Sequence, residues 1–167
     1  MQQSQVFYSE KQRFRQWWIW LPVLVSSAIF LWALVQQVAL GVLLGGNPAP
    51  DYVLVIFGLI FGAGFPLLMY RMGLDIEVRE YGVSIRFWPF HRRWVEFGFD
   101  RIQKADAITY RPLRDYGGWG IRYGTKGKAY NVSGNKGVLL TLSEGKNVLI
   151  GSKNHEALES AINEQLS

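Results

Sequence analysis

Two long runs without a charged side chain constrain this chain more than any other feature of its sequence. Trp17 to Val35 and Tyr52 to Tyr70 are each 19 residues of mainly apolar side chains, with no Asp, Glu, Lys, Arg or His in either. A helix rises about 1.5 Å per residue, so each run covers roughly the 30 Å of hydrocarbon in a bilayer. The sequence therefore predicts two membrane-spanning helices.

The segment between these runs predicts a tight connection. Gly45 to Asp51 concentrates glycine, proline and asparagine, which end helices and form turns. We expect a two-helix transmembrane hairpin over residues 17–70, with spans at about 17–37 and 52–70. The apolar run from Val38 to Leu44 allows two interpretations: the first helix continues through it, or the run lies along the membrane interface.

Two other interpretations of the apolar runs fit less well. A cleaved signal peptide has an apolar region of only about 7 to 15 residues. A pair of core helices in a soluble protein carries a polar stripe, whereas these runs are apolar all round.

Positive charge near the ends of the runs predicts their orientation. Lys11, Arg13 and Arg15 precede the first run, Arg71 and Arg79 follow the second, and the connection contains no Lys or Arg. Because Lys and Arg accumulate on the cytoplasmic side of membrane proteins, we expect both termini to be cytoplasmic.

Residues 1–16 form a basic, aromatic-rich N-terminal segment. Phe7, Tyr8 and Phe14 are interleaved with basic residues, and Trp17 and Trp18 follow. This composition is typical of an amphipathic helix on a membrane surface, and we expect one here.

Small residues in the second run suggest how the helices pack. Gly58 and Gly62 form a small-xxx-small pair that permits close approach of a second helix. Their counterpart is either the first helix of the same hairpin or another membrane protein.

Residues 71–167 predict a water-exposed domain rich in β-strands. Leu74, Ile76 and Val78 alternate with charged residues, and the pattern repeats from Val83 to Phe87 after a turn. Further strands are expected near residues 94–99, 103–110, 120–123, 128–132, 138–142 and 147–150, although the alanines within 103–110 also permit a helix. Asn154 begins an amphipathic helix whose apolar face is predicted to pack on the sheet through Leu158, Ala161, Ile162 and Leu166.

Several of these segments resemble a known kind of protein. The segments are Gly118–Arg122, Ala129–Val132, Gly137–Leu142 and Lys146–Ser152, followed by Asn154. They are similar to an uncharacterised family of bacterial membrane-anchored proteins with two N-terminal transmembrane helices and a pleckstrin-homology-like (PH-like) domain. The resemblance implies an α+β fold, in which seven or eight antiparallel strands form a partly open barrel with one C-terminal capping helix. It also implies a location in the bacterial cytoplasmic (inner) membrane and no catalytic activity.

The sequence provides few residues for chemistry. The chain has no cysteine, and its two histidines, His91 and His155, lie in a predicted turn and at a helix start. We expect no metal site, no cofactor and no catalytic residues. An enzymatic alternative would require carboxylates such as Asp100, Asp106 and Asp115 to meet in a pocket.

Basic residues in predicted loops or at their edges are the remaining candidates for a site. Loops at one end of the domain are expected to gather them against anionic lipid headgroups or a protein partner. These residues are Arg92, Arg93, Arg111, Arg114, Lys126 and Lys128. No basic helix or aromatic RNA-binding signature is present, so nucleic acid is not an expected partner.

The sequence thus favours a non-enzymatic binding or scaffolding protein, anchored in the lipid bilayer and presenting a PH-like domain at the inner face. The alternative is an accessory subunit of a membrane transporter or membrane enzyme complex. In that case Gly58 and Gly62 would contact the partner subunit.

Overall fold

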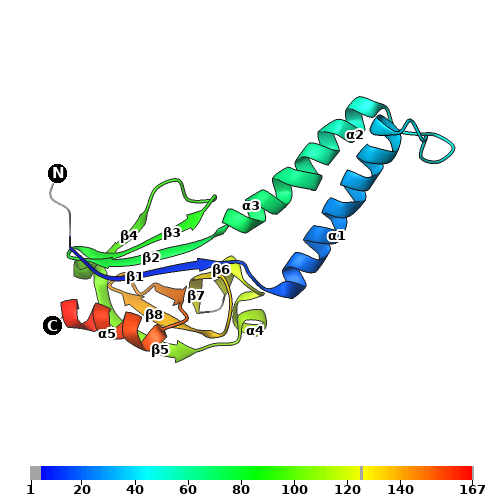
Figure 1. Ribbon diagram of the computed structural model, residues 1–167. Coiled ribbons are helices and arrows are strands. Elements are labelled where there is room, and N and C mark those ends of the chain that lie inside the picture. Colours follow the sequence, from blue (N-terminus) through cyan, green and yellow to red (C-terminus); the bar gives the residue numbers. More distant parts are fainter. Residues whose placement is uncertain (1–4, 125, 167) are drawn as a thin grey trace. The chain divides into compact units, whose positions relative to one another are not determined.

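The computed structural model describes residues 5–124 and 126–166, which divide into two compact units (Figure 1). Residues 14–72 form the hairpin unit. The sheet unit combines the chain before Phe14 with the chain from Gly73 onward. The hairpin unit is therefore an insertion within the sheet unit, and each unit is described separately below.

The hairpin unit contains the two expected long apolar helices. The first consists of α1 (Trp17–Leu34) and a π-helical end, η1 (Val35–Ala39). The second consists of α2 (Asp51–Phe57), a π-helical stretch η2 (Gly58–Gly64) and α3 (Phe65–Arg71). These continuous helices of 23 and 21 residues are long and apolar enough to cross a bilayer.

The first helix passes through the two glutamines and ends at Ala39, so only the start of the Val38–Leu44 run is helical. The Gln37 side chain is buried, and its Nε2 donates hydrogen bonds to the Ala49 carbonyl at 2.6 Å and to Asp51 Oδ1 at 2.8 Å. These bonds pair the amide nitrogen of Gln37, which would be costly to bury unpaired, whereas its Oε1 is buried without a partner among the described residues.

Close packing between the two helices involves both glycines of the small-xxx-small pair. Gly58 and Gly62 are buried, and a Cβ added to them would lie 3.2 Å from Leu34 Cδ2 and 2.7 Å from Leu31 Cδ2, respectively. The Ser27 hydroxyl donates a 2.5 Å hydrogen bond to the Gly62 carbonyl. In this structure the two glycines therefore face the first helix of their own hairpin.

The first sheet of the sheet unit begins with a strand that the sequence did not predict. Its order is β1 (Val6–Arg13), β2 (Gly73–Arg79), β3 (Gly82–Trp88) and β4 (Val95–Gly98), and all neighbouring pairs are antiparallel. β1 pairs with β2 from Val6 opposite Arg79 to Arg13 opposite Gly73. The two ends of the hairpin unit consequently attach to paired neighbours in one sheet.

The expectation of an N-terminal amphipathic helix is wrong. Residues 6–13 form a strand whose inward positions, Tyr8, Glu10 and Gln12, are more buried than the positions between them. Two of these three inward side chains are strongly polar, so hydropathy did not reveal the two-residue period. Phe7, which suggested a membrane-surface role, is exposed on the strand.

Hydrogen bonds of β1 connect the first sheet to the end of the second. Glu10 accepts a hydrogen bond from Ser152 Oγ at 2.5 Å and another from the Lys153 amide at 2.9 Å. Gln12 is fully buried, and its Nε2 donates to the Gly151 carbonyl at 2.7 Å. β1 is therefore an integral part of the sheet unit.

The second sheet confirms the remaining strands but not their expected arrangement. Its order is β5 (Ile102–Thr109), β8 (Lys136–Leu142), β9 (Asn147–Gly151), β7 (Gly127–Asn131) and β6 (Gly120–Gly124). Residues 103–109 belong to a strand, which excludes the helical alternative there. β7 and β9 are parallel, whereas the expectation was antiparallel pairing throughout. The described strands form two sheets that are not closed into a barrel.

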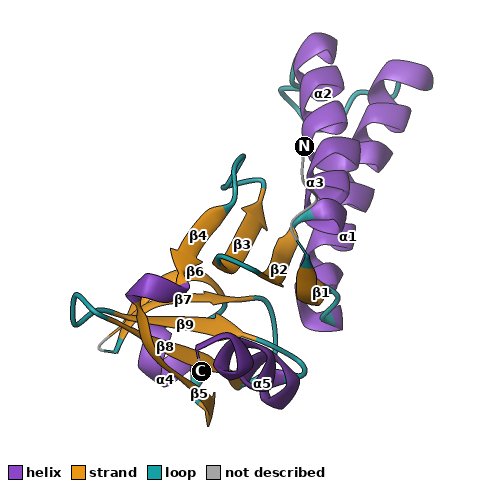
Figure 2. Cartoon of the chain, turned by 90° about the vertical axis from the view of Figure 1, so that its left-hand side faces the viewer, coloured by secondary structure: helices purple, strands orange, loops and turns teal. Residues whose placement is uncertain are grey.

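Helices cover parts of this unit (Figure 2). The predicted C-terminal helix, α5 (His155–Leu166), contacts β1, β2, β5 and β8, and its Leu158 and Ile162 are fully buried. A short helix, α4 (Pro112–Tyr116), was not expected in the loop after β5. It brings Tyr116 edge-on to Tyr110, with ring centroids 5.9 Å apart. A 3-10 turn, η3 (Phe99–Arg101), links β4 to β5.

The core consists of apolar side chains from both sheets and α5, and this burial is the main favourable contribution to folding. Fully buried members are Leu74, Ile76, Val78, Val83, Ile85, Leu140, Leu149, Ile150, Leu158 and Ile162.

The role of β1 predicts which fragment folds alone. Replacing residues 14–72 by Asn-Gly, which suits a two-residue β-hairpin turn, should leave a water-soluble, cooperatively folded protein. Residues 71–167 without β1 should not fold cooperatively, because they lack the partners of Gly151, Ser152 and Lys153. Circular dichroism during thermal unfolding distinguishes the two, and a cooperative transition in the shorter fragment would contradict the assignment.

Packing in the hairpin predicts a compensating pair of substitutions. Gly62→Leu should destabilise the detergent-solubilised chain by about 1–3 kcal/mol, because the new side chain overlaps Leu31. Adding Leu31→Ala should recover part of this loss. Ala63→Leu is the control, since Ala63 is exposed on the same helix. Equal thermal stability of the Gly62 and Ala63 variants would contradict this packing.

Candidate functional site

A groove of about 680 Å³ opens in the sheet unit between β4 and two turns of the second sheet. We call it the basic groove. Its apolar side is formed by Val95 and Phe97 of β4, together with Leu142 and Val148. The other lining residues are Arg101, Tyr123, Gly124, Lys126, Gly127, Lys128, Tyr130, Glu144, Gly145, Lys146 and Asn147.

The basic groove depends on close contact between two turns, the one joining β6 to β7 and the one joining β8 to β9. β7 and β9 are parallel neighbours, with Lys128 opposite Val148. Gly127 has φ +112°, and a Cβ there would lie 2.1 Å from the Asn147 carbonyl oxygen. Only glycine suits this conformation and this approach. Glycine at position 127 therefore brings the lysines of one turn beside Lys146 of the other.

Positive charge exceeds negative charge among the described residues of the groove. Arg101 and Lys146 both pair with Glu144, at 2.6 Å and 3.1 Å. These contacts, the hydrogen bond from Lys146 first, lower the pKa of the Glu144 carboxyl. Lys126 and Lys128 line the same groove and form no ion pair with a carboxylate in the described part of the chain.

Aromatic rings hold Lys128 in place. Its ammonium lies 4.8 Å from the ring centroid of Tyr130 and 5.3 Å from that of Tyr123. Partial burial is the largest single effect and acts to lower the pKa of Lys128, but hydrogen bonding and electrostatic attraction to Tyr130 and Tyr123 together raise it. The side chain is therefore charged at neutral pH, with its position restricted by cation–π contacts.

His91 contacts Tyr130, one of the two rings beside Lys128. Its ring meets Tyr130 edge-on, with centroids 5.6 Å apart, and its Nδ1 faces the Phe87 amide at 3.4 Å. Burial, and secondarily the charge of Lys128, lower the pKa of His91. A neutral ring fits this position, because protonated Nδ1 cannot accept from the Phe87 amide.

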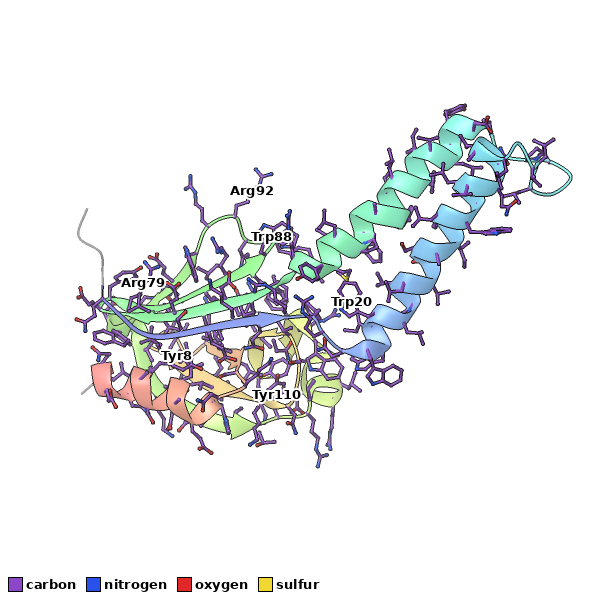
Figure 3. The ribbon with its side chains drawn as sticks, in the orientation of Figure 1. Tyr8, Trp20, Arg79, Trp88, Arg92 and Tyr110 are labelled. Carbon is purple, nitrogen blue, oxygen red and sulfur yellow. The ribbon has the colours of Figure 1, made fainter. Side chains whose placement is uncertain are left out.

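The structure separates the six basic residues predicted to act together. Lys126 and Lys128 line the basic groove, whereas Arg92 and Arg93 are exposed in the loop between β3 and β4. Arg111 precedes α4 and Arg114 lies within it, and both line a smaller depression of about 270 Å³ with Leu113 and Trp119. Figure 3 places Arg92 and Tyr110, the neighbour of Arg111, on opposite sides of the sheet unit. The expected single cluster at one end of the domain is absent among these described residues.

Two residues of the groove were not among the predicted candidates. Arg101 lies in η3 and Lys146 in the turn before β9, and the structure brings both to Glu144. The Gly-Lys pair at positions 127–128 is repeated at positions 145–146, and each pair lies in a turn or at its edge. The pairing of β7 with β9, which places these two turns side by side, leaves no local signal in the sequence.

The carboxylates considered for catalysis have separate partners. Asp106 pairs with Lys104 at 2.7 Å, and Asp115 accepts a hydrogen bond from the Arg111 amide at 2.9 Å. Asp100 is exposed in η3. The described residues contain no group of three His, Cys, Asp or Glu side chains that could hold a metal ion.

A family model matches residues 2–167, almost the full chain, and its description is "Family of unknown function (DUF6141)". The chain belongs to the DUF6141 family. No curated protein matches it. We expected the chain to belong to an uncharacterised family, and this match confirms that expectation. The family description assigns no activity or ligand.

The neighbourhood of His91 predicts a pH effect. The pKa of His91 in the folded chain is below the usual value of about 6.5. Neutral His91 therefore stabilises the fold at pH values above about 6.5. This stabilisation is lost as the pH falls below about 6.5 and through the lowered pKa. Lys128→Gln should raise the pKa of His91, which NMR titration of the ring measures directly. The His155→Gln variant shows which of the two histidine ring signals belongs to His91. An unchanged His91 pKa in the Lys128 variant would show that the two groups are not coupled.

Proposed function

We propose that this DUF6141 protein is a non-enzymatic, membrane-anchored binding or scaffolding protein. In this proposal the hairpin unit spans the bacterial inner membrane and the sheet unit is a PH-like domain at the cytoplasmic face. The domain binds anionic lipid headgroups or a protein partner.

The pairing of β1 with β2 is the observation that carries the proposal. Arg13 and Gly73 are opposite each other in the sheet, so the chain leaves for the hairpin and returns from it at one place. A segment of two apolar helices with adjacent ends can cross a bilayer twice and leave both flanking strands on the same side. The sheet unit is then held at the membrane by two connections.

Charge supports the cytoplasmic side. Lys and Arg flank the outer ends of both helices, and the connection over residues 40–50 has none. Arg15 lies near the membrane boundary in this proposal, where its guanidinium stacks on Tyr70 at 4.1 Å from the ring centroid. Tyrosine and arginine are both common at such boundaries.

Architecture supports the PH-like assignment in part. Two packed sheets with a C-terminal helix across one opening agree with it. The PH-like expectation was antiparallel pairing throughout. In this proposal the parallel pairing of β7 with β9 and the inserted transmembrane hairpin are additions particular to this family.

Labelling in intact cells tests the anchoring. Single cysteines can be introduced into this cysteine-free chain, at Gly46 in the connection and at Ser160, which is exposed on α5. The proposal expects a membrane-impermeant maleimide to label Gly46→Cys from outside and Ser160→Cys only after lysis. Labelling of Ser160→Cys in intact cells would exclude a cytoplasmic sheet unit.

Crosslinking in native membranes tests the binding role. Recovery of a stable protein partner or of anionic lipid on the sheet unit would support it. Crosslinks confined to the hairpin, all to one transporter or membrane enzyme, would instead support an accessory subunit. Gly58 and Gly62 already contact Leu34 and Leu31, so such a subunit contact would use other hairpin residues.

A further inference from the structure

The basic groove has both apolar and cationic lining residues. Val95, Phe97, Leu142 and Val148 give it an apolar side, and Lys126, Lys128, Arg101 and Lys146 give it a cationic rim. Its volume of about 680 Å³ is within the range of about 300–1,000 Å³ that is typical of small-molecule pockets.

Charge complementarity indicates which class of ligand the basic groove can bind. Glu144 is paired with Arg101 and Lys146, which leaves Lys126 and Lys128 as the cations without a carboxylate in the described part of the groove. Two lysines match the charge of about −1.5 to −2 on a phosphate monoester at neutral pH. The glycine turns permit close approach of a ligand to the backbone.

We propose that the basic groove binds a single-chain amphiphile with a phosphate monoester head, such as phosphatidic acid yields on hydrolysis of one acyl ester. The phosphate contacts Lys126 and Lys128, and the first carbons of the chain lie on Val95 and Phe97. This inference deepens the proposed binding role and rests on it for the supply of lipid, but the groove itself belongs to the sheet unit alone.

The position of Lys128 favours such a ligand over a free inorganic anion. Its ammonium is held over Tyr123 and Tyr130, and Tyr123 is itself 77% exposed. An exposed ring beside a cation offers an apolar surface to the carbons next to a phosphate. Inorganic phosphate would use the lysines and leave the apolar side in water.

The test uses the full-length chain in nanodiscs of phosphatidylcholine. Native mass spectrometry or calorimetry measures binding of decyl phosphate, decyl phosphocholine and inorganic phosphate. We expect decyl phosphate to bind at least tenfold more tightly than either of the others, because only it uses both the cations and the apolar side. If inorganic phosphate binds as tightly as decyl phosphate, the apolar side has no role in binding. If decyl phosphocholine binds as tightly as decyl phosphate, the lysines do not recognise the phosphate monoester.

Matched variants localise the site. Lys126→Gln/Lys128→Gln should weaken decyl phosphate binding at least tenfold, as expected for loss of two charge-assisted contacts. Arg111→Gln/Arg114→Gln removes the same charge from the α4 region and should change affinity less than twofold. Equal weakening by both pairs would mean that net charge, not the groove, determines binding. A thermal melt shows that each variant is folded, and Phe97→Ser provides an independent loss of the apolar side.

An acidic peptide is the competing occupant. Tight binding of a Glu-rich extended peptide, without binding of decyl phosphate, would overturn the proposal in favour of a protein ligand. These measurements use purified protein and do not depend on which side of the membrane the sheet unit occupies. A wrong orientation and a wrong ligand therefore give different results.

Discussion

The pairing of β1 with β2 is the interaction on which the rest of this structure depends. It joins two parts of the chain that the whole hairpin unit separates in sequence, and it makes them neighbours in one sheet. Closing so long a loop has an entropic cost, which grows only slowly with length. The pairing is supported by side chains of β1 that reach beyond the first sheet: Gln12 contacts the end of β9, and Glu10 contacts Ser152 and Lys153 in the link between β9 and α5.

This arrangement makes the two sides of the sheet unit different. Near α5, β1 and the helix cover the opening between the sheets, and the buried hydrogen bond from Gln12 connects β1 to β9. At β4 the sheets do not close, and the opening is the basic groove. Absence of a closed barrel is thus the structural origin of the candidate site. The parallel pairing of β7 with β9 completes it by placing two lysine-bearing turns side by side.

Sequence patterns predicted the elements that have a strong hydrophobic signal. For the two long helices the signal is an uninterrupted apolar run. For β2, β3 and the Leu158–Ile162 face of α5 it is a hydrophobic period. β1 was missed because its inward residues Glu10 and Gln12 are polar and acquire partners only in the folded chain.

The candidate site was harder to predict than the strands. Lys126 and Lys128 were chosen because they lie in a predicted turn or at its edge, but the same criterion also chose Arg111 and Arg114, which line a different depression. The order of the strands in the second sheet distinguishes the two lysines from the two arginines. This strand order depends on contacts between residues far apart in sequence. Parallel pairing across a crossover leaves no local signal, so Arg101 and Lys146 could not be assigned to the groove in advance.

A disulfide between β1 and β2 tests the central claim most directly. Ser9 and Glu77 are opposite each other, and the native chain has no cysteine. Opposed residues of antiparallel strands lie about 4.5–5.5 Å apart at Cα, within the range that a disulfide spans. A protease site placed in the connection over residues 40–50 then allows the two halves to be separated on a denaturing gel.

In native membranes, Ser9→Cys/Glu77→Cys should oxidise readily, so that cleaved chains stay joined until reductant is added. Lys11→Cys/Glu77→Cys, displaced by two positions, should not. Separation of the halves in both variants under oxidising conditions, or equal crosslinking in both, would contradict the insertion of the hairpin between two paired strands.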